Sequence, residues 1–256
     1  MPVTLKSEDE IRIMREAGQI VGQTLEAIRG MIAPGLNIIE IERFIRQEFR
    51  ARGAKETFLH YQPAPRFPPY PSNVCISIND ELVHGIPRDR LLREGDIVSI
   101  DLGATYRGYV GDAAITVAVG QVPDEVSALI RVTENALSAG IKAAATARYL
   151  IDISGAIEDA ITPSGFGIVT GYGGHGIGRH MHEEPHILNH RTRSKGIPIR
   201  PGLVIALEPM VTLGNPEVIE CADGWTVKTK DGSLSCHFEH TIAIREQHEP
   251  EVLTLP

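Results

Sequence analysis

The sequence predicts an α+β fold in which two related halves, at about residues 7–120 and 121–256, form a single catalytic domain. Each half runs through two helical patterns into strands. In addition, the segment 93–101 (REGDIVSID) resembles the segment 200–208 (RPGLVIALE), and both end an apolar strand with an acid. An internal repeat of this kind indicates a pseudo-two-fold architecture with a site between the halves.

Two amphipathic helices are predicted at the start of the chain. Ser7 and Glu10 form a capping-box pattern ahead of apolar residues at helical spacing, and Pro34-Gly35 closes the segment. A second helix is predicted to begin after Asn37 and to end near Gly53.

The remainder of the first half is predicted as a loop and strands. Five prolines between Pro63 and Pro71 indicate a stiff, extended surface loop. Strands are predicted at Val74–Ile78 and Glu81–Ile86, and Gly95–Val119 is predicted to form a hairpin.

The second half is predicted to repeat this order. Asp124–Ala145 and the segment around Leu150 to Ile157 have helical periodicity, and Leu203–Leu207 and Thr241–Ile244 are apolar strands.

Composition excludes several classes of protein. The 256 residues are 42% hydrophobic and carry a net charge of -8, which argues against DNA or an anionic membrane as partner. Three cysteines without CxxC spacing form no disulfide framework and no zinc-thiolate site. The start of the chain does not have the pattern of a signal peptide, and no apolar run is long enough to cross a bilayer. A cytoplasmic location is therefore expected.

Two aspartates in the predicted hairpin raise an electrostatic problem. A turn centred between Tyr106 and Arg107 would place Asp101 directly opposite Asp112, with Cβ atoms about 5 Å apart. Their neighbours are apolar, so both carboxylates would be buried, which costs on the order of several kcal/mol unless compensated. Either one aspartate is protonated, or a cation lies between them.

Three further residues favour the cation. Glu208 ends one apolar strand and Glu239 precedes another, where only apolar residues would be expected. His175 lies in the glycine-rich stretch 171–185, and histidine is the commonest metal ligand. Four carboxylates and one imidazole match two divalent cations of Mn, Fe(II), Co or Zn, and two-metal sites typically serve hydrolysis.

Several motifs in this order resemble the type I methionine aminopeptidases, and the resemblance runs from about residue 7 to the end of the chain. They are Asp101…Asp112, Gly174-His-Gly-Ile-Gly178, His182-Glu-Glu-Pro185, Leu207-Glu-Pro-Met210 and Asp231-Gly-Ser-Leu-Ser…Phe238-Glu-His-Thr241. The resemblance implies the pita-bread fold, in which two pseudo-symmetric α/β halves with antiparallel sheet enclose a dinuclear metal site.

The resemblance also implies an activity, which is removal of the N-terminal methionine from nascent proteins and peptides, preferably before a small second residue. By motif, Asp101 would bind one metal, His175 and Glu208 the other, and Asp112 and Glu239 both. A metal-activated water would attack the peptide bond, with Glu208 as general base and acid.

Further residues would contact the substrate. His182 would hydrogen-bond the scissile carbonyl and His84 the scissile amide nitrogen. The methionine pocket would be lined by Tyr70, Cys75, Met181 and Trp225. Glu208 follows His175 by only 33 positions, which leaves no room for the helical insertion of type II enzymes, and no extra N-terminal domain is expected. The expected partner is the N-terminal peptide of a nascent protein, and the ribosome exit region is a further candidate. The enzyme is expected to be a monomer.

The sequence departs from the family at four places. Met181 occupies a position where phenylalanine is common, the loop Pro63–Pro71 is longer and less glycine-rich than usual, and Cys236-His237 replaces a small-polar pair. The segment 146–148 lacks the Pro-Gly that closes the first helix at Pro34-Gly35.

Three alternatives remain. The segment 171–176 matches G-x-G-x-x-G, but the residues after it do not have the pattern of a helix, which a nucleotide site requires. A metal-free peptide-binding module would lack metal ligands, whereas all five are present. An exopeptidase with X-Pro preference would carry an N-terminal domain.

Overall fold

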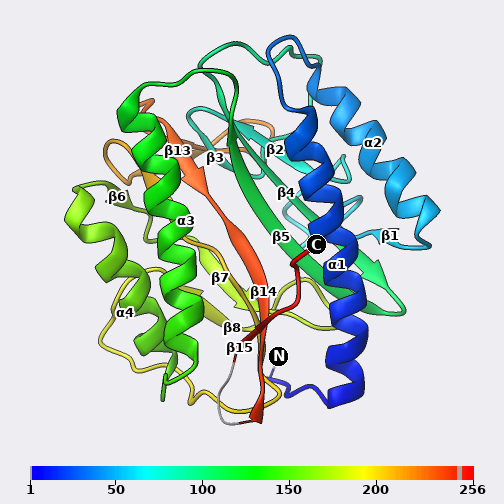
Figure 1. Cartoon of the computed structure of the whole chain (residues 1–256), viewed down its shortest axis with the longest axis vertical. Helices are drawn as coiled ribbons and strands as arrows, with labels where there is room; N and C mark the ends of the chain where they lie inside the picture. Colours follow the sequence, from blue (N-terminus) through cyan, green and yellow to red (C-terminus); the bar gives the residue numbers. More distant parts are fainter. Residues whose placement is uncertain (1, 247–249) are drawn as a thin grey trace.

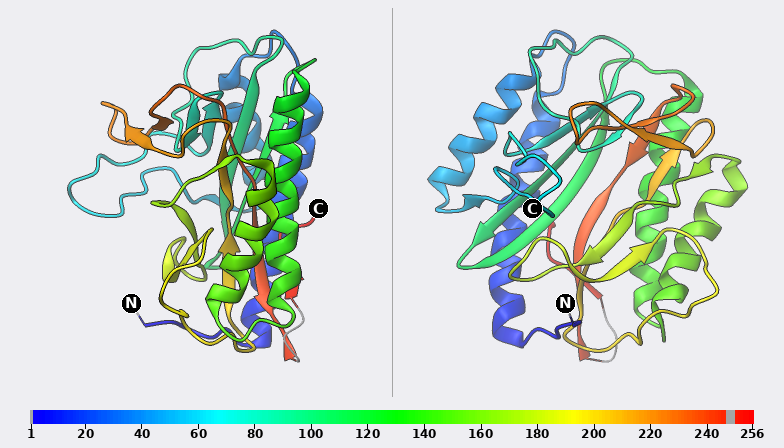
Figure 2. Two further views of the ribbon diagram at one scale, coloured as in Figure 1. Left: turned by 90° about the vertical axis from the view of Figure 1, so that its left-hand side faces the viewer. Right: turned by 180° about the vertical axis from the view of Figure 1, so that it is seen from behind.

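The computed structural model describes residues 2–246 and 250–256. Its helices all cover one face of a large antiparallel sheet, and the other face carries loops and two small sheets (Figure 1; Figure 2, left). The helices are α1 (Glu8–Met31), α2 (Ile38–Ala51), α3 (Asp124–Ala144) and α4 (Leu150–Ile161), followed by the 3-10 turn η1 (Thr162–Ser164). The predicted α+β class is confirmed.

The large sheet has nine strands in the order β1-β4-β5-β14-β9-β7-β8, with β15 paired to β14 and β2 paired to β4. These strands are β1 (Lys55–Glu56), β2 (Cys75–Ile78), β4 (Ile97–Tyr106), β5 (Tyr109–Ala118), β7 (Gly173–Gly176), β8 (Glu183–Leu188), β9 (Val204–Leu207), β14 (Glu239–Ile244) and β15 (Pro250–Val252). The small sheets contain β13 (Ser235–His237), β10 (Met210–Thr212) and β6 (Gly167–Ile168), and β11 (Val218–Glu220), β12 (Val227–Thr229) and β3 (Glu81–Val83).

The two halves of the chain meet at the centre of this sheet. There β5 pairs with β14, and they are flanked by β4 and β9. Helix α1 packs on β4 and β5, while α3 packs on β13 and β14. Figure 1 shows α1 and α2 on one side of the sheet centre and α3 and α4 on the other. Helices from both halves of the chain therefore pack on the central strands.

The helix starts follow the sequence signals. The Ser7 side chain accepts a hydrogen bond from the Glu10 N–H, and the Glu10 carboxylate accepts one from the Ser7 N–H at 2.8 Å. This reciprocal pair satisfies two N–H groups that no helical carbonyl can reach. Asn37 caps α2 by accepting from the Ile39 N–H at 3.1 Å.

A close contact between glycines sets the direction of the site residues. A Cβ added to Gly111 of β5 would lie 2.5 Å from the backbone nitrogen of Gly18 in α1, so the helix rests directly on the strand. Successive side chains of a strand point to opposite faces. Since Gly111 faces the helices, Asp112 points to the opposite face.

The predicted register of the β4–β5 hairpin is wrong by two positions. The two-residue turn is Arg107-Gly108, both with positive φ, and Asp101 pairs with Ala114 while Asp112 pairs with Gly103. A two-residue turn with positive φ at both positions matches the twist of a hairpin, and Gly108 favours it. The shift preserves the face, so the two aspartates are diagonal neighbours on the same side of the sheet.

Two other segments differ in part from the prediction. The predicted strand Glu81–Ile86 ends at Val83, because His84 takes a positive φ of 59° and turns the chain. The segment Pro63–Pro71 has no helix or strand, as predicted. It is not only a surface loop, however, because Phe67 packs against Trp225 with ring centroids 5.8 Å apart.

Among the described residues, no helix is long and apolar enough to span a membrane.

Candidate metal centre

A cavity of about 290 Å³ brings together every residue that the sequence predicted for metal or substrate binding. The predicted residues that line it are Tyr70, Cys75, His84, Asp101, Asp112, His175, Met181, His182, Glu208, Trp225 and Glu239. They come from both halves of the chain, so the fold must form before the site exists.

The floor of the cavity is built by five neighbouring strands. In sheet order, β4, β5 and β14 carry Asp101, Asp112 and Glu239, Glu208 follows directly after β9, and β7 carries His175. All five residues are buried, with at most 8% of the surface of each exposed. Each of the five neighbouring strands therefore contributes one possible metal ligand, and the ligands form a row across the sheet.

One group of possible ligands lies on the central strands. One ligand atom each from Asp112, His175 and Glu239 lie within 4.8 Å of one another. The His175 Nε2 is 3.6 Å from a Glu239 carboxylate oxygen and 4.0 Å from an Asp112 oxygen. The His175 Nδ1 donates to the Gly176 carbonyl at 2.9 Å. This bond fixes the tautomer and leaves Nε2 free as an acceptor for a metal.

Burial changes the acid–base chemistry of the carboxylates. It raises the pKa of Asp112 to about 7. Burial and then the neighbouring acids raise the pKa of Asp101 and Glu239 well above the ordinary range, and the pKa of Glu208 is raised in the same way. The shared and largest cause is burial, in a site that, within the described residues, pairs these acids with no Lys or Arg.

Unpartnered oxygens show that the site fits a metal. Within the part of the chain that is described, Asp101 Oδ1, Asp112 Oδ1 and Glu239 Oε1 are buried without a hydrogen-bond partner. Leaving a buried polar group unpaired costs about 1–3 kcal/mol, and more for a charge. A divalent cation offsets this charge, and a set of carboxylate oxygens with an imidazole nitrogen suits Mn, Fe, Co or Zn.

The cavity wall is apolar and is held by hydrogen bonds to backbone. The Tyr70 hydroxyl donates to the Gly85 carbonyl at 2.9 Å, and Trp225 Nε1 donates to the Pro68 carbonyl at 3.0 Å. The two rings meet edge to face at 5.1 Å. Cys75 pairs directly opposite Asp101 between β2 and β4, which places the wall beside the acids. Met181 is also buried against this group.

Two further imidazoles border the acids. The rings of His182 and His175 have centroids 4.3 Å apart. Burial and the neighbouring His175 lower the pKa of His182, and burial lowers the pKa of His84 to about 4. Both side chains are therefore neutral near pH 7 and able to donate one hydrogen bond.

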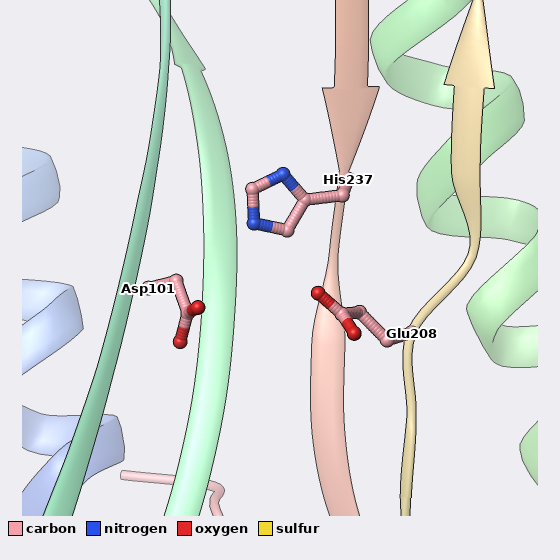
Figure 3. A group of neighbouring side chains, drawn as sticks. All are labelled: Asp101, Glu208 and His237. Carbon is pink, nitrogen blue, oxygen red and sulfur yellow. The ribbon is translucent and has the colours of Figure 1, made fainter. Parts of the chain in front are cut away.

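Two residues of the site were missed at the sequence level. Tyr61 lines the cavity, and its hydroxyl is 2.6 Å from His182 Nδ1. His237 lies near Asp101 and Glu208, and these three side chains converge in Figure 3. A signal for His237 was present, because the alternation His237-Phe238-Glu239 places it on the side of Glu239. No sequence pattern distinguishes Tyr61.

Glycines in β7 allow the donor strand to pack closely. A Cβ at Gly174 would lie 2.1 Å from the Ala206 carbonyl oxygen, and one at Gly176 would lie 2.2 Å from the Glu184 carbonyl oxygen. Only glycine fits at these positions, so the sequence around His175 is explained by packing against neighbouring backbone.

Comparison with known proteins identifies the family. The sequence matches metallopeptidase family M24 over residues 12–246. A methionine aminopeptidase from Aquifex aeolicus is 44% identical, with 99% of both chains covered. Methionine aminopeptidase 1 from Bacillus subtilis is 41% identical, with 95% of this chain and 96% of that protein covered.

Solved structures show the same relationship. The crystal structure of a methionine aminopeptidase from Thermotoga maritima has a TM-score of 0.94 at 38% identity and covers both chains completely. A prolidase from Pyrococcus furiosus, at 22% identity and a TM-score of 0.76, shares the fold over 98% of this chain and 65% of its own. The predicted pita-bread fold is confirmed, and the chain belongs to metallopeptidase family M24.

Proposed function

We propose that this protein removes the N-terminal methionine from nascent proteins and peptides, preferably when the second residue is small. The observation that carries the proposal is the convergence of four buried carboxylates and His175 on the floor of an apolar cavity. Relatives that match over nearly the whole chain are methionine aminopeptidases, which supports the same substrate.

Two divalent cations are the proposed cofactors. Asp101 would hold one, His175 and Glu208 the other, and Asp112 and Glu239 would contact both. When bound, such a pair lowers the pKa of a water to near neutrality and polarises a carbonyl group. Mn, Co, Fe(II) and Zn all suit this set of donors.

The remaining chemistry belongs to side chains of the protein. Glu208 is the proposed base that accepts the proton of the attacking water and passes it to the leaving amine. His182 is the proposed donor to the scissile carbonyl oxygen, where negative charge develops. The contact of Tyr61 with Nδ1 of His182 supports this role because it orients the ring. His84 would contact the scissile amide nitrogen.

The wall of the cavity is the proposed methionine pocket. Tyr70, Cys75, Met181 and Trp225 present apolar rings and sulfur atoms, which make favourable contacts with a thioether. The methionine side chain would lie against this wall while its carbonyl carbon lies over the acids.

Several broader features are also proposals. The chain would act as one catalytic domain of two halves, at about residues 7–120 and 121–256, and as a monomer. Its substrates would be N-terminal peptides in the cytoplasm, with access near the ribosome exit region. The contact between β5 and β14 at the sheet centre supports the division into halves.

A peptide assay tests the proposed function. Wild-type protein is expected to release methionine from Met-Ala-Ser after addition of Mn²⁺ or Co²⁺, and to lose this activity after dialysis against a chelator. A Xaa-Pro dipeptide should be a poor substrate. Activity that survives chelation, or preference for the Xaa-Pro dipeptide, would contradict the proposal.

A further inference from the structure

His237 is a buried imidazole beside the carboxylates of the floor. Its exposed fraction is 0%, and it does not contribute to the cavity surface. One of its ring nitrogens and one oxygen each of Asp101 and Glu208 lie within 4.8 Å of one another. Figure 3 shows the imidazole projecting from the strand that carries it toward the two acids.

The position of His237 is set by its backbone. Residue 237 ends β13 and lies two positions before Glu239, the first residue of β14, so both side chains point to the same side of this extended segment. Thr116 of β5 holds this backbone by donating its hydroxyl to the His237 carbonyl at 2.6 Å, and it accepts the His237 N–H at 3.3 Å. The imidazole is therefore placed by the central strands, next to Asp101 and Glu208.

Neither ring nitrogen of His237 forms a hydrogen bond to any described residue. The backbone of Leu82 lies near the ring and partly opposes the lowering of its pKa by burial, but it does not reach hydrogen-bond geometry. Two unpaired buried nitrogens cost about 1–3 kcal/mol each, so this arrangement calls for a further partner. Asp101 Oδ1 is unpartnered in the same way.

We propose that His237 is an additional nitrogen ligand for the metal that Asp101 would hold. This inference rests on the proposed function, because it requires that the site holds metal. Each of the two metals would then have one imidazole ligand: His175 on the metal that Glu208 also holds, and His237, which lies close to Glu208 as well, on the metal that Asp101 holds.

A second imidazole changes which cations bind. Nitrogen donors favour the later divalent metals of the first transition row over magnesium or calcium, which prefer oxygen. His175 is oriented by its bond to Gly176, whereas His237 lacks such a bond in the described residues. Ligands without an orienting partner bind more weakly. The affinity of the His237 position should therefore be the lower of the two.

Cobalt binding provides the test. Chelator-treated wild-type protein, His237→Gln, His175→Gln and the control His240→Gln are titrated calorimetrically with Co²⁺. The exchangeable imidazole N–H protons that Co²⁺ shifts strongly are then counted by proton NMR. His240 is a matched control because it adjoins Glu239 on the opposite face and its Nδ1 contacts the Thr254 hydroxyl at 2.8 Å. Thermal denaturation of the metal-free variants checks that each is folded.

The wild-type protein is expected to bind two Co²⁺ and to show two strongly shifted imidazole signals. His237→Gln should weaken one Co²⁺ by about tenfold or more and remove one signal, and His175→Gln should remove the other. The His240→Gln control should change neither. One shifted signal in the wild type overturns the proposal even if His237→Gln does not fold.

Unchanged Co²⁺ affinity in folded His237→Gln also overturns it. Weaker binding with both signals retained would make His237 a positioning residue for Asp101 and not a ligand. Failure of the wild type to bind Co²⁺ at all would instead contradict the proposed function.

Discussion

The floor and the wall of the cavity are held in place by different means. The floor acids Asp101, Asp112 and Glu239 lie on regular strands, so the sheet register alone fixes their directions. The wall residues Tyr70 and Trp225 lie on loops and are held by hydrogen bonds from their side chains to distant backbone carbonyls. The floor should therefore control whether reaction occurs, and the wall which substrate is accepted.

The largest expected effect comes from removing a floor donor. Glu239→Gln keeps the shape of the side chain but loses the charge that would contact both metals. Since loss of an outer hydrogen-bond partner of a metal ligand already costs about 10–100-fold, activity should fall by more than about 100-fold. Metal content by elemental analysis and hydrolysis of Met-Ala-Ser measure this loss. The exposed Glu184→Gln is the control, and full activity in Glu239→Gln would contradict the assignment of the floor.

A wall substitution should separate binding from chemistry. Trp225→Leu removes the ring that contacts Tyr70 and the bond to Pro68. We expect KM for Met-Ala-Ser to rise about tenfold, equivalent to about 1.4 kcal/mol of lost methionine contact, while metal content stays unchanged. Tyr149→Leu, a substitution of a more exposed aromatic at the start of α4, is the control. Loss of metal in Trp225→Leu would mean that wall and floor are not independent.

The smallest effect concerns stability against pH. Burial raises the pKa of Asp112 from 3.8 to about 7, so the folded metal-free protein binds more protons than the unfolded chain between these values, and stability falls as pH rises through this window. Buried histidines such as His175, whose pKa is lowered from 6.5 to about 4, act in the opposite direction but only below about pH 6.5. Between pH 6.5 and 8 only the carboxylates contribute to this dependence. The free energy of unfolding then falls by about 1.4 kcal/mol per pH unit for each extra proton that the folded state binds.

The melting temperature of the metal-free protein should therefore fall from pH 6.5 to 8, and added Mn²⁺ should abolish or reverse the fall, because protons compete with metal for the same oxygens. Asp112→Asn should reduce the slope without metal. A slope that is the same with and without Mn²⁺ would separate the floor acids from metal binding.

The same contrast explains what the sequence could predict. Acids interrupting apolar strands identify Asp101, Asp112, Glu208 and Glu239 as unusual, and period-two alternation assigns their face even though the hairpin turn lies at Arg107-Gly108. An error of two positions in the strand register does not affect this assignment, since it leaves each side chain on the same face of the sheet. The internal repeat similarly predicts the helices and the acid-bearing strands.

The remainder depends on contacts between distant segments. The contact of Tyr61 with His182 joins residues 121 positions apart, and no local pattern encodes it. Strand β7 was not predicted because its residues are mostly glycine, which has low strand propensity and here is selected by neighbouring backbone. The residues of the proposed methionine pocket were predicted only through resemblance to a family, because apolar residues on loops have no periodicity that would identify them.

The glycines of β7 have a consequence for protein engineering. Because a methyl group at Gly174 or Gly176 would overlap backbone oxygens of the neighbouring β9 strand and of Glu184, no rotamer change can make room for it. A saturation library across residues 173–176 should therefore return only glycine at both positions, even under selection for folding alone. Directed evolution of substrate preference should leave this strand untouched and vary the loops around Pro68 and Gly224, which lie close to each other beside Trp225 of the cavity wall.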